Sequence, residues 1–158
     1  GLPKFSKQDS NSILNEGDLN TPEDKLIKNF KKLKLKLPKI NKYWFKDIPL
    51  SKLPKNICFA HLDGDLYSSI LESLDKIYSR LSKGAIVIID DYCDLKKHKK
   101  IERKLNSNKW NKNTNRKYFI KDIFPGVKKA SDKFFRDKKE KPDILISGDQ
   151  CHVYFIKK

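Results

Sequence analysis

The sequence has no long apolar run, no paired cysteine motif and little arginine, and each of these absences excludes a class of protein. No run approaches the ~20 apolar residues of a membrane-spanning helix, and no charged-then-apolar leader opens the chain. The three cysteines, Cys58, Cys93 and Cys151, are widely spaced and form no CxxC pair. This spacing excludes a disulfide framework or a zinc module built on cysteine pairs and favours a reducing compartment. We therefore expect a cytoplasmic protein with no membrane partner.

The chain is strongly basic, but its charge is unevenly distributed. Of its 158 residues 36 are basic and 20 acidic, which gives a net charge of +16. Residues 25–55 carry 11 lysines and one aspartate, and residues 96–141 carry 18 basic and five acidic side chains, whereas residues 56–95 have a net charge of −4. Only four basic residues are arginine, the residue best suited to phosphate and base recognition. The charge therefore predicts a solvated surface rather than a nucleic-acid interface.

The acidic centre of the chain has the clearest structural pattern. The apolar run at 56–62 and residues 85–89 predict two strands buried on both faces. Between them, apolar side chains recur at helical spacing over 67–81, and Lys83–Gly84 is the expected end of that helix. A strand, a helix and a strand in this order predict two parallel, neighbouring strands with a right-handed crossover.

Other segments complete a single α/β domain over residues 1–158. The remaining predicted elements are a helix over 21–37, a short strand over 40–45, a helix after Pro125–Gly126, and a hairpin of strands 143–147 and 151–156. Residues 93–124 are rich in lysine and asparagine and weakly periodic, so we expect them to be a basic insertion on the surface. The fold class is then α/β, a mostly parallel sheet flanked by helices and finished by an antiparallel C-terminal hairpin.

Two pairs of acids follow the two central strands at the point where each strand ends. Asp63 and Asp65 follow the first, separated by Gly64, and Asp90 and Asp91 follow the second. Parallel neighbours lie ~4.8 Å apart and end at the same edge of the sheet, where ligands of open α/β sheets bind. Four acids meeting there would repel one another without a cation, and oxygen ligands favour Mg²⁺. The pattern thus predicts a divalent metal site.

Each of these polar residues also has a simpler interpretation. Asp65 could cap the helix that begins near Tyr67, which would not exclude a chemical role. His61 and His152, inside strands, are expected to be core histidines, and His98, in a lysine run, is expected to be solvated. Among the cysteines, 58 and 151 fit core positions, and the one at 93 lies near the acids.

The segment from 56 to 92 contains NICFAHLDGDLYSS, a helix ending in LSKG and a strand ending in IIDDY. These motifs resemble the signature of the TylF/macrocin O-methyltransferase family, which is HxDGDLYxS, LSxGG and IIDDY. Outside it, GLP at 1–3, WFKDIP at 44–49 and PGVKKA at 125–130 resemble further family segments. Members are S-adenosylmethionine-dependent and methylate sugar hydroxyls. The resemblance implies a Rossmann-like class I methyltransferase fold.

The resemblance also implies roles for the acids and for the partners. Asp63, Asp90 and Asp91 would hold a Mg²⁺ ion that chelates the hydroxyls of a sugar-like acceptor and lowers their pKa. Asp65 would be the general base that takes the proton of the methylated hydroxyl. The expected cofactors are therefore S-adenosylmethionine and Mg²⁺, and the expected partner is a small hydroxylated, sugar-like molecule. The oligomeric state stays open, and a homo-oligomer is one possibility.

Two features depart from the family pattern. No G-x-G-x-x-G loop occurs in residues 1–158, and the family places its donor-binding loop upstream of GLP. We therefore expect the chain to be the C-terminal two-thirds of a methyltransferase domain that is incomplete at its N-terminus. If the donor-binding half is missing, the chain is expected to be inactive in isolation. The insertion at 93–124 stands where the family continues almost at once into PG, so it could alter the choice of acceptor.

Two other functions are alternatives. A haloacid-dehalogenase-like phosphohydrolase also places acids after two strands, but only 26 residues separate Asp63 from Asp90, too few for the other motifs of that fold. A noncatalytic basic binding module would use the cationic surface, with the acids serving only the structure. Steep loss of nucleic-acid affinity with salt would be its signature.

Overall fold

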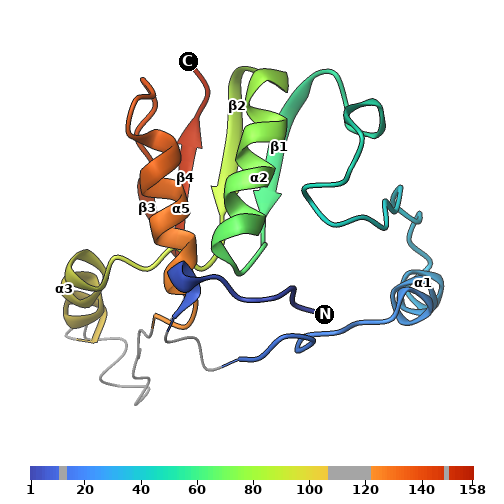
Figure 1. Cartoon of the computed structure of the whole chain (residues 1–158), viewed down its shortest axis with the longest axis horizontal. Coiled ribbons are helices and arrows are strands. Elements are labelled where there is room, and N and C mark those ends of the chain that lie inside the picture. Colours follow the sequence, from blue (N-terminus) through green and yellow to red (C-terminus); the bar gives the residue numbers. More distant parts are fainter. Residues whose placement is uncertain (11–13, 107–121, 148–149) are drawn as a thin grey trace.

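The chain forms a four-stranded sheet with two helices packed on one face (Figure 1). The computed structural model describes residues 1–10, 14–106, 122–147 and 150–158. The strands are β1 (Ile57–Leu62), β2 (Leu81–Ile89), β3 (Asp143–Ser147) and β4 (Gln150–Ile156), in the spatial order β1-β2-β4-β3. The main helices are α1 (Glu23–Lys32), α2 (Tyr67–Ile77), α3 (Leu95–Asn106) and α5 (Pro125–Phe135), with short 3₁₀ turns at Lys7–Asp9, Leu50–Lys52 and Tyr78–Arg80.

The predicted strand–helix–strand unit and the C-terminal hairpin are both confirmed. β1 and β2 are parallel neighbours, with Leu62 opposite Ile89 at their carboxyl ends. β4 runs antiparallel to both β2 and β3, so within the described residues only one of the three pairings is parallel. This part of the chain therefore forms a mixed sheet, in which the parallel pair belongs to the predicted strand–helix–strand unit and both antiparallel pairings involve the predicted C-terminal hairpin.

The core lies between the sheet and helices α2 and α5. Alternate residues of the central strands, including Val87, Ile89 and Phe155, are almost fully buried against these helices. Phe135 of α5 packs edge-to-face on Phe155 of β4, with ring centroids 4.7 Å apart. Apolar side chains at helical spacing on α2 and α5 meet this buried face, as the sequence predicts.

The other face of the sheet corrects the prediction of strands buried on both sides. Phe59, Ile86 and Ile156 stand opposite one another on β1, β2 and β4, and each is at least 43% exposed. Among the described residues β1 is also an edge strand, and Cys58 and His61 are exposed on it. The predictions that both are core residues are wrong, because an apolar run does not reveal which face of a strand is covered.

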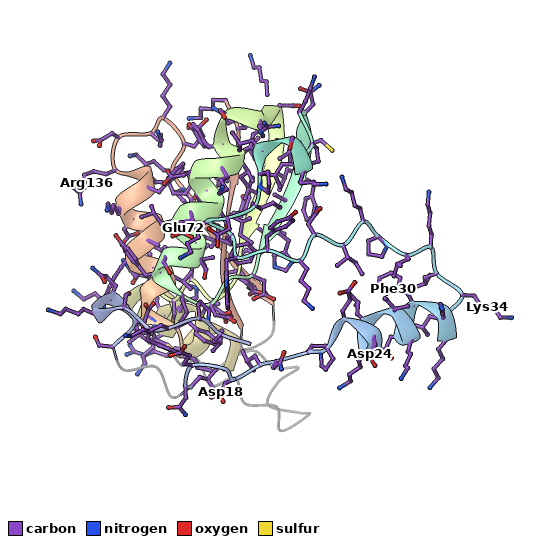
Figure 2. The ribbon with its side chains drawn as sticks, turned by 45° about the vertical axis from the view of Figure 1, so that its right-hand side comes forward. Asp18, Asp24, Phe30, Lys34, Glu72 and Arg136 are labelled. Carbon is purple, nitrogen blue, oxygen red and sulfur yellow. The ribbon has the colours of Figure 1, made fainter. Side chains whose placement is uncertain are left out.

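Several element boundaries also differ from the sequence prediction. Residues 40–45 are mostly irregular, with a bend at 43 and the start of a turn at 45, rather than a strand. α2 ends at Ile77, and after a 3₁₀ turn β2 already begins at Leu81, so Lys83–Gly84 lies inside the strand. The first helix is confirmed, but it ends at Lys32 and its N-cap is Pro22, with no side-chain capping bond. Figure 2 shows α1, with Phe30 and Lys34, standing well away from the sheet.

A few residues at the ends of the expected surface insertion are buried, although most of the described residues of 95–103 are exposed. Cys93, His98 and Phe124 are buried, and residues 95–106 form α3. The prediction of a solvated His98 is wrong, and its exposed fraction is 0%. Residues 107–121, the middle of the predicted insertion, lie outside the described residues. Within the described parts of the chain, no helix combines the length and the apolar character needed to cross a bilayer.

Candidate active site

The carboxyl ends of β1 and β2 bring three of the four predicted acids together. One carboxylate oxygen each of Asp63, Asp65 and Asp91 lies within 4.8 Å of the other two. The parallel pairing of the two strands places the acids at one edge, because Asp63 directly follows Leu62 and Asp90 directly follows Ile89. The predicted convergence of the strand ends is therefore present in the structure.

Two of these acids have a left-handed backbone conformation. Asp65 has φ +59° and Asp91 has φ +57°, a region that aspartate and asparagine tolerate better than most residues. Between the first two acids Gly64 is needed for a close approach: a Cβ added there would lie 3.1 Å from the Cβ of Ser69 and 3.2 Å from the Cδ1 of Ile70. Sharp turns at both strand ends thus direct these carboxylates inward, at a conformational cost that is common at functional sites.

The electrostatics of the cluster are unfavourable for three free carboxylates. Burial, followed by the negative charges of Asp90, Asp65 and Asp63, raises the pKa of Asp91 to about 7. Burial and the charge of Asp63 also raise the pKa of Asp65, although a hydrogen bond with Asp91 opposes this increase. In the absence of a cation, Asp65 and Asp91 are therefore expected to share a proton below about pH 7, and Asp91 holds it mainly.

Asp90 is outside the group of three oxygens within 4.8 Å of one another, although its charge acts on Asp63 and Asp91, and it contacts two histidines. Its Oδ2 lies 3.3 Å from His61 Nε2, and its Oδ1 is in close contact with His152 Nδ1. His152 is buried in β4, as the sequence predicts, but its Nδ1 makes no hydrogen bond with the described residues and only this close contact with Asp90. Asp90 still acts on the cluster, because its charge, after burial, contributes to the raised pKa of Asp63. Neither histidine was singled out in the sequence as a partner of the acids, because the contact needs β1, β2 and β4 to be placed side by side.

Asp65 does not cap helix α2. The N-cap position is Leu66, which makes no side-chain capping bond. The first backbone N–H of the helix, that of Tyr67, instead donates to Asp9 Oδ1 at 2.7 Å. The alternative interpretation of Asp65 as a helix cap is therefore excluded, and its carboxylate is free to belong to the cluster.

A cavity of about 680 Å³ opens beside the acids. This volume is in the range of small-molecule sites. The wall includes the segment 41–45, in which Tyr43, Trp44 and Phe45 are each at least 44% exposed, and the cavity also reaches Asp63 and Asp65. An aromatic surface next to carboxylates suits a ligand that has both apolar faces and hydroxyl groups.

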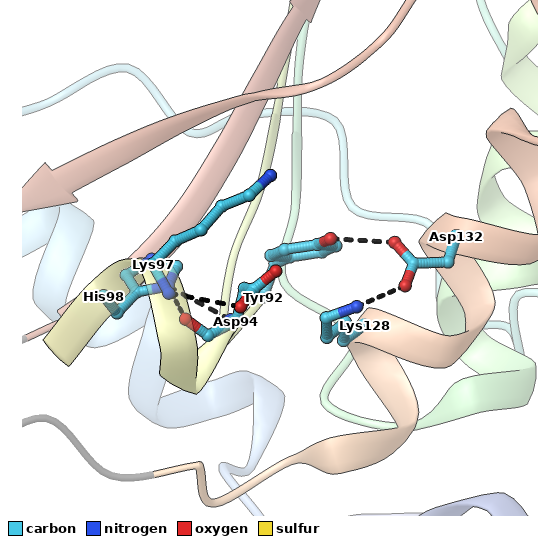
Figure 3. A network of polar contacts seen from close by, with 6 residues as sticks. All are labelled: Tyr92, Asp94, Lys97, His98, Lys128 and Asp132. Atoms are coloured by element: carbon cyan, nitrogen blue, oxygen red, sulfur yellow. Dashed lines mark hydrogen bonds and ion pairs between the residues drawn. The ribbon is translucent and has the colours of Figure 1, made fainter. Parts of the chain in front are cut away.

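Tyr92 fixes the chain directly after the acids. Its hydroxyl donates to Asp132 Oδ1 of α5 at 2.8 Å, and Lys128 pairs with the other oxygen of the same carboxylate (Figure 3). Burial and the hydrogen bond to Asp132 raise the pKa of Tyr92 above its ordinary value, so the phenol stays protonated and keeps donating. The turn that carries Asp90 and Asp91 is thereby anchored to the helix layer.

The donor set suits magnesium. Three carboxylates offer hard oxygen ligands, and their mutual repulsion, which raises their pKa values, is the feature that a bound cation would relieve. Ligand oxygens on one octahedral Mg²⁺ lie about 3.0 to 4.2 Å apart at the usual bond length of ~2.1 Å, so three oxygens within 4.8 Å of one another are close to the arrangement that the ion needs.

Together these features define an α/β protein of Rossmann-like architecture with a carboxylate site at the carboxyl ends of its parallel strands. The chain belongs to the Macrocin-O-methyltransferase (TylF) family, which matches residues 1–113. The solved structure of the O-methyltransferase NovP has the same fold, with a TM-score of 0.58 and 23% identity over 86% of this chain and 45% of that chain.

Two curated relatives are similar over a shorter segment. One is an 8-demethyl-8-(2,3-dimethoxy-alpha-L-rhamnosyl)-tetracenomycin-C 4'-O-methyltransferase of Streptomyces olivaceus, 45% identical over 49 residues, which cover 31% of this chain and 19% of the relative. The other is a Mycinamicin III 3''-O-methyltransferase of Micromonospora griseorubida, 40% identical over 50 residues, which cover 32% and 20% of the two chains. The matched segments therefore span about a fifth of the length of these relatives.

Proposed function

We propose that the protein is a metal-assisted O-methyltransferase that acts on a hydroxyl of a sugar or glycosylated small molecule, with S-adenosylmethionine as the methyl donor. The observation that carries this proposal is the convergence of Asp63, Asp65 and Asp91 beside the aromatic-lined cavity. Membership of the TylF family and the names of the two relatives support the reaction and the class of acceptor. They argue against the phosphohydrolase and the basic binding module.

The metal ligands in this proposal are Asp63, Asp90 and Asp91. When bound, Mg²⁺ would polarise an acceptor hydroxyl and lower its pKa. The histidine contacts of Asp90 are compatible with this role, because each carboxylate oxygen has two lone pairs and ligating carboxylates are usually oriented by further hydrogen bonds. His152 and His61 would then be positioning residues for Asp90.

Asp65 is the general base in this proposal. Its turn, with φ +59°, brings the carboxylate against Asp91 and into the wall of the cavity, where an acceptor hydroxyl can approach it. A base must be unprotonated to act, and the proton shared by Asp65 and Asp91 would leave when a cation takes its place. Asp65 would then accept the proton of the acceptor hydroxyl.

The cavity wall positions the acceptor. Trp44 and Phe45 present exposed rings on which the apolar face of a sugar can pack, while the acids lie where its hydroxyl groups would be. Because S-adenosylmethionine already carries an activated methyl group, alignment of the acceptor supplies most of the rate enhancement. We assign no residue of this chain to the methyl donor, since the sequence contains no G-x-G-x-x-G loop.

Methyl transfer by the whole protein tests the proposal directly. Incubation with S-adenosylmethionine, Mg²⁺ and a panel of glycosylated acceptors should give S-adenosylhomocysteine and a product heavier by one methylene, detected by mass spectrometry. Asp63→Asn should abolish Mg²⁺ binding in calorimetry, whereas Asp65→Asn should retain it and lose about 10²- to 10⁴-fold in turnover.

The matched control is Asp75→Asn, because Asp75 is an exposed carboxylate in the second half of α2. It should leave both metal binding and turnover unchanged. Full turnover in excess EDTA, or an unimpaired Asp65→Asn variant, would contradict the proposed roles.

A further inference from the structure

A second cluster of ligating side chains lies behind the strand ends, and the proposed reaction does not use it. It consists of Cys93, His98 and Cys151, and one ligating atom of each lies within 4.8 Å of the other two. All three residues are buried, with exposed fractions of 3%, 0% and 5%. Cys93 precedes α3, His98 is in its first half and Cys151 is in β4, so the cluster joins three segments that are distant in sequence.

The imidazole of His98 is oriented as a metal ligand usually is. Its Nδ1 lies 2.9 Å from the backbone carbonyl oxygen of Asp94 and 3.0 Å from the backbone nitrogen of the same residue (Figure 3). Nδ1 donates to the carbonyl in one tautomer, which leaves Nε2 as a ligand, and accepts from the N–H in the other. Its Nε2 is fully buried and has no hydrogen-bond partner among the described residues. Metal-bound histidines almost always donate one ring N–H to a carbonyl or carboxylate and use the other nitrogen as the ligand. A cation on Nε2 would remove the cost of a buried polar atom without a partner.

The two sulfur atoms form a thiol–thiol hydrogen bond rather than a disulfide. Cys151 Sγ donates to Cys93 Sγ at 3.4 Å. A disulfide requires ~2.05 Å. Two thiolates on one tetrahedral zinc ion, each at ~2.3 Å from the metal, lie about 3.8 Å apart. The observed separation is therefore much closer to the separation across a zinc ion than to a covalent bond.

Asp122 lies near the cluster, outside the group of three ligating atoms within 4.8 Å of one another, and its carboxylate could supply a fourth ligand. It is at the end of the chain segment that enters α5, and its Oδ1 is buried with no hydrogen-bond partner among the described residues. The carboxylate is close enough for its charge to act on both thiols. Asp122 Oδ1 is thus, after His98 Nε2, the second buried atom without a partner near the cluster. Zinc accepts carboxylate oxygens as ligands.

We propose that Cys93, His98 and Cys151 bind a structural zinc ion, with Asp122 as the fourth ligand. Soft sulfur and imidazole ligands select zinc over Mg²⁺, which distinguishes this site from the carboxylate cluster. The ion would tie the start of α3 and the entry to α5 to strand β4. It would also fix the backbone beside the carboxylate site, since Cys93 is two residues after Asp91 and Cys151 directly precedes His152.

Metal analysis of the whole protein, purified under reducing conditions from zinc-supplemented medium, tests the site. About one zinc per chain is expected, as in other structural sites. Loss of a mere outer partner lowers metal affinity by about 10- to 100-fold, so Cys93→Ser and Cys151→Ser should each lower it by at least about 100-fold. Cys58→Ser is the matched control, because Cys58 is the remaining cysteine and is exposed; it should retain the zinc.

Cobalt substitution tests the ligands without relying on the folding of variants. Co²⁺ bound to the wild-type protein and to Cys58→Ser should show sulfur-to-cobalt charge-transfer absorption, which zinc then removes by displacement. Asp63→Asn should retain this spectrum, which separates the zinc site from the proposed methyl-transfer site. Wild-type protein that binds neither metal tightly when reduced, or a Cys93→Ser/Cys151→Ser protein that binds zinc as well as wild type, would overturn the proposal. A Cys93–Cys151 disulfide whose reduction yields no zinc binding would overturn it as well.

Discussion

Asp9 caps helix α2 from a position 58 residues earlier in the chain. Its Oδ1 accepts a hydrogen bond from the backbone N–H of Tyr67 at 2.7 Å, and its Oδ2 accepts one from the backbone N–H of Ser6 at 2.9 Å. The carboxylate is buried, with an exposed fraction of 2%. α2 follows directly after Asp63 and Asp65, so the cap fixes the helix start on which the proposed active site depends.

Asp9→Ala should destabilise the protein. It leaves the N–H of Tyr67 without an acceptor at the start of a buried helix, and it also releases Ser6. Loss of an N-terminal cap costs about 1–2 kcal/mol, and the loss here should reach the upper end of this range because the site is buried. Chemical denaturation monitored by circular dichroism measures the change. Asp18→Ala is the control, because Asp18 accepts a backbone hydrogen bond from Asn15 in an exposed loop and should cost under about 0.5 kcal/mol. Equal effects of the two substitutions would contradict the special role of Asp9.

Gly126→Ala should also destabilise the protein, although alanine is favoured over glycine by about 1 kcal/mol inside a helix. A Cβ at this position in α5 would lie 1.9 Å from Asp9 Oδ1 and 2.8 Å from the backbone nitrogen of Tyr67. Overpacking of this kind costs about 1–3 kcal/mol. Thermal unfolding measures the loss, and the double variant with Asp9→Ala supplies the test of cause. The double variant lacks the nearest clashing atom, so its loss of stability should be smaller than the sum of the losses in the two single variants. A loss equal to that sum would contradict the contact between Gly126 and Asp9.

Local patterns in the sequence predict the elements that position the site. The apolar spacing of α2 and α5, the parallel pair of β1 and β2, and the C-terminal hairpin all follow from helix and strand periodicity and from turn residues. The acids at the two strand ends come together for the same reason, because parallel strands end at one edge. These relationships depend only on short sequence segments and on the rule that the parallel strands of a strand–helix–strand unit end at the same edge of the sheet.

Relationships that depend on the packing of distant segments could not be predicted in this way. Ser6-x-x-Asp9 has the pattern of a local capping box, but nothing in it points to Tyr67. His98 lies in a lysine-rich helix and is nevertheless buried, because its side chain lies next to Cys93 and to Cys151 of β4. Likewise, the exposure of Phe59 and Ile86 depends on what covers each face of the sheet, a property that strand composition does not contain.

The stability of the metal-free protein should depend on pH through Asp91. Its pKa is about 7 in the folded protein, against an ordinary value of 3.8, so the folded state binds the proton more tightly than the unfolded state. The stabilisation from this proton is present below pH 3.8 and is lost as the pH rises through about 7. Between pH 3.8 and about 7 in EDTA, the free energy of unfolding of the wild type should therefore fall relative to that of Asp91→Asn. Denaturation curves recorded at successive pH values measure this difference. Asparagine keeps the left-handed backbone at this position.

Magnesium supplies the control for this pH dependence. At pH values above 7, Mg²⁺ should stabilise the wild-type protein, because the ion replaces the lost proton, and should not stabilise Asp91→Asn to the same extent. Parallel stability curves for the two proteins in EDTA across the whole interval would show that Asp91 does not hold the raised pKa.

His152→Ala should weaken Mg²⁺ binding although the histidine is not itself among the proposed ligands. His152 Nδ1 contacts Asp90 Oδ1 from a buried position in β4, and its removal leaves Asp90 free to rotate. Loss of such an orienting partner lowers metal affinity by about 10- to 100-fold, measured by calorimetry at fixed pH. His61→Ala is the matched control: His61 contacts the other oxygen of the same carboxylate at 3.3 Å, but its side chain is 47% exposed, so water can replace it and the effect should be smaller. Unchanged Mg²⁺ affinity in His152→Ala, with Asp90→Asn also unimpaired, would remove Asp90 from the proposed metal ligands and leave Asp63 and Asp91 with the ion.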